Sequence, residues 1–249
     1  MKVSIITATY NSAATVGRTL KSVREQTHPD IEHIIVDGAS KDNTLAIVAA
    51  EGPHVAKVVS EKDRGIYDAM NKGIALATGD VIGLLNSDDF LVNPDTIATI
   101  AHTMQEEGLD ALYGDVGFFQ PGNIEKTVRR YRSNRFSPKA LAWGWMPAHP
   151  TLYLRREVYE RFGVFKTDYR IAGDYEFVAR IFHEGRLKYR YLPSVLVRMQ
   201  MGGASTGGWR SNLLLNQETL RACRENGIST NWFKILSKYP LKMLEFARR

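Results

Sequence analysis

The stretch Ala77-Thr78-Gly79-Asp80-Val81-Ile82-Gly83-Leu84-Leu85-Asn86-Ser87-Asp88-Asp89 is an apolar run that stops at two adjacent carboxylates. Its residues 81–85 are almost uniformly apolar, which predicts a strand buried on both faces of a sheet. Ligands of open α/β sheets bind outside the carboxyl ends of the strands, where Asp88 and Asp89 would emerge. The pair suits Mg²⁺ or Mn²⁺ held together with substrate phosphates. The alternative is a helix cap, since Asn93-Pro94-Asp95 follows at once.

The rest of the first half alternates strand and helix signals with short connections. Strands are expected over residues 2–9, 31–36 and 55–60, and helices over 11–26, from 40–43 onward, and over 66–77. Further strands are expected at 111–117, 127–131 and 152–154, and helices at 174–181 and 209–226. This order predicts the α/β class, with a Rossmann-like, mostly parallel sheet flanked by helices and a C-terminal helical extension.

Composition bounds the class of protein. The chain has 249 residues, 44% of them hydrophobic, which is enough for one large domain. The single cysteine, Cys223, excludes an internal disulfide framework and a cysteine-based zinc site, and it fits a reducing cytosol. No signal peptide and no apolar run of about 20 residues is visible, so we expect a cytoplasmic protein. The formal charge of +6 is compatible with anionic lipid, phosphorylated substrates or simple solubility.

Polar residues follow each of the first three expected strands, as they follow the fourth. The segments are 7–11, 37–40 and 61–65. Each is typical of a turn, but four in succession at one sheet edge predict a nucleotide site. Tyr10 can stack on a base, Asp37 and Asp63 can accept from base or ribose, and Asp88 and Asp89 can bind a metal diphosphate. The chain has neither a Gly-x-Gly-x-x-Gly fingerprint after the first strand nor a phosphate-binding P-loop.

Four stretches resemble the successive motifs of family 2 glycosyltransferases, in particular the bacterial enzymes that build capsular, exopolysaccharide or O-antigen units. They are Val3-Ser4-Ile5-Ile6-Thr7-Ala8-Thr9-Tyr10-Asn11, Val36-Asp37-Gly38-Ala39-Ser40-Lys41-Asp42-Asn43-Thr44, Asp63-Arg64-Gly65-Ile66-Tyr67-Asp68-Ala69-Met70-Asn71-Lys72-Gly73 and Leu85-Asn86-Ser87-Asp88-Asp89. The resemblance implies a GT-A fold and an inverting, metal-dependent transfer from a nucleotide sugar, with a UDP-sugar as the expected donor. It also implies a saccharide acceptor linked to a lipid diphosphate.

By this resemblance, Asp89 is the direct metal ligand and Asp88 lies nearer the donor sugar or ribose. The positions expected to bind the nucleotide sugar are Thr7, Thr9, Tyr10, Asn11, Asp37, Asp63, Arg64, Asn71, Asn86, Ser87, Asp88 and Arg198. One departure is Met70, where many relatives carry arginine, and this leaves the phosphate contacts of that loop open.

The second half is expected to bind the acceptor. Trp143 and Trp145 are read either as a platform for sugar rings or as core side chains. His149 is a candidate ligand of metal or acceptor, or else a structural histidine. Asp174 matches the family's catalytic aspartate, and it can also cap the helix that follows. Glu176 is the runner-up for the same role.

Two basic segments remain. Lys126, Arg129, Arg130, Arg132 and Arg135 form either a solvated face or a pocket for an acceptor diphosphate. Residues 229–249 alternate basic and aromatic side chains, which suits a helix in an anionic membrane interface on the cytosolic face of the inner membrane. The alternative is a tail packed on the protein itself.

The expected organisation is a GT-A domain over 1–228, with a nucleotide-sugar half at 1–110, an acceptor half at 111–228 and the tail at 229–249. Two other functions compete with glycosyl transfer: a sugar-phosphate nucleotidylyltransferase, and a nucleotide-sugar-binding module without turnover. No nucleic-acid partner is expected, and the sugar, the acceptor and the oligomeric state stay open.

Overall fold

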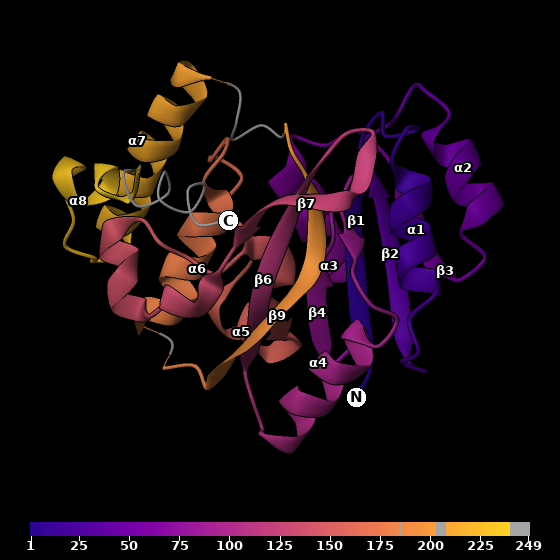
Figure 1. Cartoon of the computed structure of the whole chain (residues 1–249), viewed down its shortest axis with the longest axis horizontal. Helices are drawn as coiled ribbons and strands as arrows, with labels where there is room; N and C mark the ends of the chain where they lie inside the picture. The colour runs from indigo at the N-terminus through magenta and orange to yellow at the C-terminus, as the bar shows by residue number, and fades with distance from the viewer. Residues whose placement is uncertain (185, 203–207, 240–249) are drawn as a thin grey trace.

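One mixed sheet runs through the molecule in the order β3-β2-β1-β4-β8-β6-β9-β5, with β7 paired to β6 (Figure 1). The structure is a computed structural model that describes residues 1–184, 186–202 and 208–239. The strands are β1 (Val3–Thr9), β2 (Ile31–Asp37), β3 (Val55–Ser60), β4 (Val81–Leu84), β5 (Phe90–Leu91), β6 (Ala111–Gln120), β7 (Asn123–Tyr131), β8 (Tyr153–Arg155) and β9 (Tyr189–Gln200).

Helices cover both faces of this sheet. They are α1 (Val16–Arg24), α2 (Thr44–Glu51), α3 (Ile66–Leu76), α4 (Thr96–Glu106), α5 (Arg156–Phe162), α6 (Gly173–Glu184), α7 (Trp209–Glu225) and α8 (Trp232–Leu236). Three 3₁₀ turns, η1 (Ser133–Arg135), η2 (Pro138–Trp143) and η3 (His149–Thr151), connect β7 to β8. Among the described residues, no helix combines the length and the apolar character that crossing a membrane requires.

The N-terminal half is parallel and packed on both faces. β1 pairs with β2 and β4, and β2 pairs with β3, all in parallel. Successive side chains of a strand point to opposite faces, so Ile35 packs with α1 and α2 while Ile34 and Val36 pack against α3. β4 is buried along its whole length, as its apolar run predicts.

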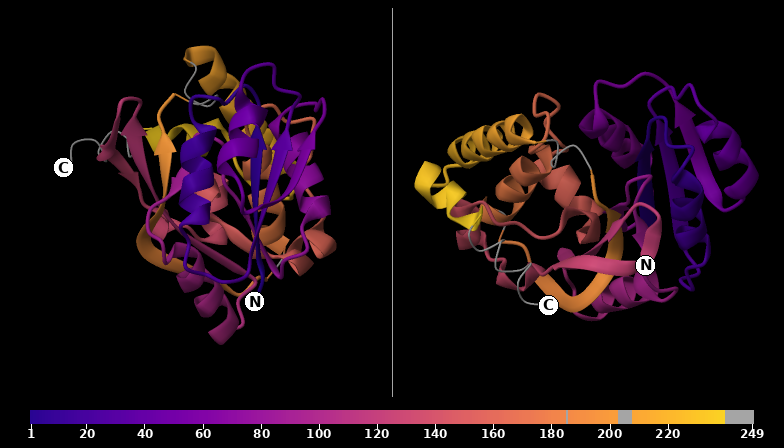
Figure 2. Two further views of the ribbon diagram at one scale, coloured as in Figure 1. Left: turned by 90° about the vertical axis from the view of Figure 1, so that its right-hand side faces the viewer. Right: turned by 45° about the horizontal axis from the view of Figure 1, so that its top comes forward.

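The sheet continues into the second half without a break. β8 joins β4 in antiparallel orientation and also pairs with β6. β9 then runs parallel to β6 and carries the short β5 on its other edge. The two halves therefore share one sheet, while α6, α7 and α8 gather at the end of the molecule away from β1 to β3 (Figures 1 and 2).

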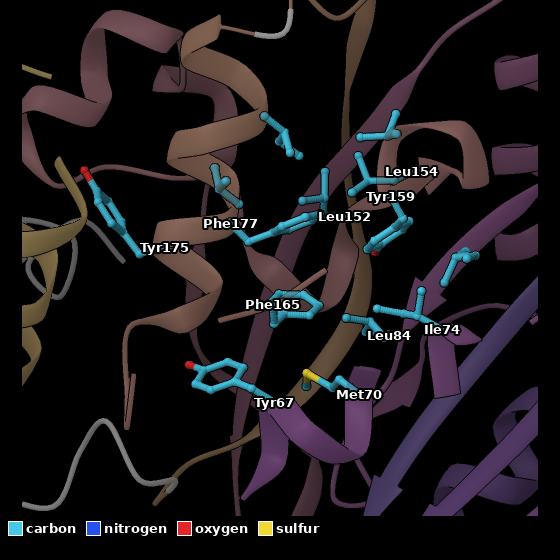
Figure 3. Packing of buried hydrophobic residues seen from close by; sticks show 14 of the residues in the cluster. Tyr67, Met70, Ile74, Leu84, Leu152, Leu154, Tyr159, Phe165, Tyr175 and Phe177 are labelled. Atoms are coloured by element: carbon cyan, nitrogen blue, oxygen red, sulfur yellow. The ribbon is translucent and has the colours of Figure 1, made fainter. Parts of the chain in front are cut away.

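An aromatic core joins α3 to α6. Tyr67 stacks on Phe165 with ring centroids 5.8 Å apart, and Phe165 contacts Phe177 at 4.6 Å. Tyr159 also stacks on Phe177, with ring centroids 5.2 Å apart (Figure 3). Aromatic pairs at such distances add to the apolar burial, so this cluster fixes the position of α6 relative to the nucleotide half.

The sequence predicts most element positions within a few residues, and the differences have local causes. α1 begins at Val16 and not after Asn11, because the Ser12 carbonyl accepts from Thr15 and Val16 and forms a separate turn. β6 and β7 are longer than expected because they pair as an antiparallel hairpin. Of the tail expected at 229–249, residues 240–249 lie outside the described residues.

Candidate active site

The structure brings together the loops that follow β1, β2 and β4. The Asn11 amide donates to Ser40 Oγ at 2.8 Å, and Lys41 N donates to Asn11 Oδ1 at 2.9 Å. Ser12 Oγ and Ser87 Oγ are 2.8 Å apart, which links the β1 loop to the β4 loop. Asn11 and Ser87 therefore form hydrogen bonds within and between the loops and stabilise the loop conformations.

Gly38 lies between two expected nucleoside contacts. A methyl group added there would come within 2.5 Å of Asp63 Oδ2 and 3.4 Å of the Tyr10 ring. The Tyr10 side chain is exposed, so one face of its ring is accessible to a base. Tyr10, Gly38 and Asp63 therefore form one continuous surface at the sheet edge, where a nucleoside can lie.

Asp37 supports this surface from below. It is completely buried and accepts from Ser40 N at 2.9 Å and from Ser60 Oγ at 2.6 Å. Thr7 is also buried, with its hydroxyl 3.1 Å from His33 Nε2. By contrast, Thr9 Oγ1 is buried and has no hydrogen-bond partner within the described part of the chain. Of these three side chains, Thr9 has the hydrogen-bonding capacity left for a ligand.

Asn71 and Arg64 have protein partners. The Asn71 amide donates to the Phe165 carbonyl at 2.8 Å and accepts from the Phe165 amide at 2.9 Å. Arg64 forms an ion pair with Asp68 at 2.8 Å. Met70, the expected departure from the family motif, is buried in the core. Asn71 thus holds the segment before α6, and α3 presents no arginine at that position.

Asp88 and Asp89 differ in exposure. Asp89 is fully buried, with Gln200 N and Asn86 Nδ2 each 3.3 Å from one of its oxygens. Burial raises the pKa of Asp89 well above its ordinary value, and the neighbouring Asp88 raises it further. Burial also raises the pKa of the half-buried Asp88. Two carboxylates in this setting favour a cation.

Arg18 supplies the positive charge next to this pair. Its guanidinium donates to the Asp88 carbonyl at 3.1 Å and lies over the rings of Phe90 and Phe119. Its Nε is buried without a hydrogen-bond partner among the described residues. The sequence analysis did not find Arg18. In the sequence, a helix arginine that faces a binding site looks the same as one that faces solvent.

The carboxylates of Asp88 and Asp89 fit a divalent cation whose coordination shell is completed by the substrate. Mg²⁺ and Mn²⁺ are usually held by one or two carboxylates together with substrate phosphates. Among residues 1–184, 186–202 and 208–239, no three His, Cys, Asp or Glu side chains form a metal cluster. Asp88 and Asp89 could therefore anchor such an ion, but its remaining ligands would have to come from donor and water.

Asp174 lies in the first turn of α6, beside His149. Burial raises the pKa of the Asp174 carboxyl, and the nearby His149 opposes this rise. Burial also lowers the pKa of His149, against the effect of Asp174, so the imidazole is neutral near pH 7. The His149 ring packs on the edge of Phe165 at 5.8 Å. A carboxylate with a raised pKa beside a neutral imidazole is suited to accept a proton.

Two side chains from other helices hold this turn. Tyr67, in the first turn of α3, donates its hydroxyl to the Ile171 carbonyl at 2.6 Å and accepts from Gly173 N at 2.9 Å. Glu218 of α7 accepts from three successive amides, those of Arg170, Ile171 and Ala172, at 2.8 to 2.9 Å. Because α3 starts at the carboxyl end of the sheet, Tyr67 places Asp174 near the edge where the nucleotide loops meet.

Glu176 has a different environment. It is completely buried and forms ion pairs with Arg180 and Lys166, each at 3.0 Å. Asn226 donates to the same carboxylate at 3.4 Å. These contacts occupy both oxygens of Glu176, which joins α6 to the segment before it and to the end of α7. The geometry thus favours Asp174 over Glu176 as a base.

The other expected acceptor and phosphate residues belong to other elements than Asp174. Trp143 ends η2 and contacts Lys234 of α8, close to the C-terminal end of α6. Trp145 is half-buried in the adjoining loop. Arg198 donates to the carbonyls of Ile124 and Glu125 in β7, and within the basic run Arg130 pairs with the buried Asp115. Trp143 therefore lies toward the far end of α6 from Asp174, and Arg198 is held by β7.

The chain matches known proteins over most of its length. A family model described as Glycosyl transferase family 2 matches residues 4–163, well over half of the chain. The chain is a family 2 glycosyltransferase. This glycosyltransferase is 32% identical over 223 residues to the PGL/p-HBAD biosynthesis glycosyltransferase of Mycobacterium tuberculosis, with 88% of this chain and 82% of the relative covered. An uncharacterized glycosyltransferase of the same species is 34% identical, with 72% and 68% covered.

Solved structures share its fold. TarS of S. aureus in complex with UDP-GlcNAc superposes with a TM-score of 0.69 at 18% identity, covering 90% of this chain and 72% of that one. The mannosyltransferase PcManGT of Pyrobaculum calidifontis, in complex with GDP-Man and Mn2+, gives 0.63 at 23% identity, with 88% and 64% covered. The chain spans 39% of a longer TarS structure. These likenesses confirm the GT-A fold expected from the sequence motifs.

Proposed function

We propose that this family 2 glycosyltransferase moves a sugar, with inversion, from a nucleotide sugar to a saccharide acceptor. The supporting observation is that acidic side chains from two parts of the chain lie toward one sheet edge: the pair Asp88 and Asp89, of which Asp89 is fully buried, and Asp174 in the first turn of α6. An inverting transfer needs charge stabilisation on the leaving diphosphate and a base on the opposite face of the sugar. One carboxylate cannot serve both faces.

The donor is proposed to be a UDP-sugar, bound at the surface of Tyr10, Gly38 and Asp63. Structural neighbours of the same fold were solved with UDP-GlcNAc and with GDP-Man, so the fold accommodates either nucleotide. Asp88 and Asp89 would hold Mn²⁺ or Mg²⁺, which would supply a Lewis acid for the diphosphate.

Asp174 is proposed as the base. The acceptor hydroxyl oxygen forms a bond to the anomeric carbon as the bond from that carbon to the donor phosphate oxygen breaks. The bonding pair leaves with the nucleoside diphosphate, and the hydroxyl proton passes to Asp174. Such a positioned base contributes about 10²- to 10⁴-fold to rate. Burial raises the pKa of Asp174, and the hydrogen bond from Gly173 N to the Tyr67 hydroxyl holds the turn that carries it.

The acceptor is proposed to be a lipid-linked saccharide in the building of a bacterial surface glycolipid or polysaccharide. A relative named as a PGL/p-HBAD biosynthesis glycosyltransferase supports a role in biosynthesis. A lipid-linked acceptor would place the enzyme at the cytosolic face of the inner membrane, and the basic tail at 229–249 was expected to make that contact.

The test is a screen of nucleotide sugars with and without Mn²⁺, in which nucleoside diphosphate release and product stereochemistry are measured. We expect release that needs both metal and acceptor, with an inverted anomeric centre in the product. Binding without any turnover would identify a sugar-binding module. Formation of a nucleotide sugar from a sugar phosphate would identify a nucleotidylyltransferase.

A further inference from the structure

One face of the molecule combines basic and aromatic side chains from two segments that contain no acidic residue. It is built from η2 and α8, which pack together although they are far apart in the sequence. The chain has no Asp or Glu between Lys126 and Arg156, and none between Asn226 and Leu244. We call the surface of η2 and α8, with residues Lys139, Trp143, Trp232, Phe233, Lys234 and Leu236, the basic aromatic face.

The apolar side chains of this face point into solvent. α8 is anchored by Ile235, which is completely buried, and Thr230 Oγ1 donates to the Ala142 carbonyl at 2.5 Å just before the helix. The opposite side of α8 leaves Trp232 42%, Phe233 77% and Leu236 45% exposed, and Trp143 of η2 is 40% exposed. Grouped exposed apolar side chains of this kind mark an interaction surface.

A pocket opens within this face. It lies between η2, the end of α6 and α8 and has a volume of about 340 Å³. Trp143 and Ile228 form apolar walls, and Lys139, Lys234 and His183 bring basic groups to the rim. Lys234 Nζ lies 5.8 Å from the centre of the Trp143 ring. The pocket thus offers cationic donors beside apolar surface.

We propose that the basic aromatic face docks on an anionic phospholipid bilayer, with one phosphate-bearing headgroup in this pocket. Lysines near an anionic leaflet are attracted to it, while Trp, Phe and Leu enter the boundary between headgroups and acyl chains. The absence of acidic residues from both segments gives the charge complementarity that such a surface requires. The contact uses η2 as well as α8, so it is not confined to the tail.

Docking at this face would suit the proposed acceptor. His183 at the pocket lies nine residues after Asp174 on α6, which corresponds to about 14 Å along the helix. A saccharide whose lipid anchor stays in the bilayer could reach Asp174 over that span. This step alone depends on the proposed function, and the docking surface does not.

The test is sedimentation of the full chain with vesicles of phosphatidylcholine alone or with about one third phosphatidylglycerol. We expect binding to the anionic vesicles, weakened by salt, and weak binding to the neutral ones. The double variant Trp232→Ser/Phe233→Ser is expected to lower the partition coefficient by about tenfold or more, because it removes two exposed aromatic side chains that would enter the membrane. Lys139→Glu/Lys234→Glu is expected to lower it similarly, through charge reversal.

Matched controls come from the same chain. Trp209→Ser removes an aromatic side chain that is 71% exposed on α7, outside the face, and Lys21→Glu reverses an exposed lysine on α1. Both controls should bind vesicles as the natural chain does. Vesicle binding that the face variants leave unchanged would overturn the proposal. A wild-type chain that does not bind anionic vesicles would also overturn it. So would a dimer of the wild-type chain, measured by light scattering, that the Trp232→Ser/Phe233→Ser variant does not form.

The two proposals fail separately. Asp174→Asn should bind vesicles normally while losing transfer, and the face variants should keep transfer to a water-soluble acceptor. If the chain binds anionic vesicles through this face but transfers no sugar, the proposed function is wrong and the docking surface stands.

Discussion

At the level of single residues, the environments of the acidic side chains separate their roles. Asp174 and Glu176 are two positions apart on α6, yet Asp174 meets His149 and Tyr67 while Glu176 is ion-paired with Lys166 and Arg180. The sequence motif proposed Asp174 as the base. It could not exclude Glu176, because an arginine at the i+4 position is common on helices, while the contacts from Lys166 and Asn226 depend on the tertiary fold.

We expect Asp174→Asn to lower kcat by about 10²-fold or more, with donor affinity and melting temperature almost unchanged. Asparagine keeps the size and the capping ability of the side chain but cannot take a proton. The measurement is steady-state kinetics with thermal melting.

Because burial raises the pKa of Asp174, the acid limb of the wild-type rate profile should lie above the ordinary aspartate value of about 3.8. Glu176→Gln is the control and should lower stability while the folded enzyme keeps its kcat. The opposite pattern would make Glu176 the base.

Asp89→Asn should weaken the binding of nucleoside diphosphate in the presence of Mn²⁺ by about tenfold or more, because one of two anionic anchors is lost. The fold should persist, since asparagine fits the same buried space between Asn86 and Gln200. Calorimetric titration with and without Mn²⁺ measures the effect, with the exposed Asp30→Asn as control. Equal, metal-enhanced affinity in wild type and Asp89→Asn would refute the assignment.

At the level of elements, helices from three parts of the chain fix one turn. Tyr67 of α3 and Glu218 of α7 bind the backbone just before Asp174, across 106 and 46 residues of sequence. Periodicity predicted each helix separately, and α3, α6 and α7 all appear near the expected positions. It could not predict these contacts, because a buried tyrosine or glutamate on a helix gives no signal of its partner.

Tyr67→Phe should lower kcat by about tenfold, with the donor KM unchanged. The ring stays stacked on Phe165, but the hydroxyl that fixes Ile171 and Gly173 is lost. That hydroxyl also lowers the pKa of Asp174, so its removal should move the acid limb of the rate profile to higher pH.

The control is Tyr191→Phe, which loses a comparable hydrogen bond to Asp115 on β6. Both variants should lose about 1 to 3 kcal/mol of stability. Only Tyr67→Phe should shift the pH profile, and an unshifted profile would reduce Tyr67 to a purely structural role.

At the level of the whole molecule, one continuous sheet and several buried polar groups determine stability. The parallel half was predictable from its alternation of strands and helices. The joining of β4 to β8 and of β5 to β9 was not, because short antiparallel strands carry little sequence pattern. Nor could the sequence show that His33, in the middle of β2, lies buried between Thr7 and His54.

The His33 and His54 pair should make the fold sensitive to acid. Burial, and then the neighbouring His54, lower the pKa of His33 to about 3. The unfolded chain binds a proton at this histidine below about pH 6.5, while the folded chain stays neutral. As the pH is lowered from about 6 to about 4, this site alone should therefore decrease the unfolding free energy by about 1.4 kcal/mol per pH unit.

Urea unfolding at several pH values measures this slope. His33→Gln should reduce the slope, since glutamine can keep hydrogen bonds to Thr7 and His54 but does not titrate. His102→Gln, at an exposed position on α4, should leave the slope as in the natural chain. An identical slope in His33→Gln would place the acid sensitivity elsewhere.

The shared sheet also sets rules for engineering. A chimera that exchanges the second half with that of a relative would cut the β4 to β8 and β5 to β9 pairings, as well as the Tyr67 contact to α6. Recombination at residue 110 should thus yield insoluble hybrids more often than specificity changes. The η2 and α8 segments, which carry the proposed docking surface, are the better units to transplant between enzymes of this family.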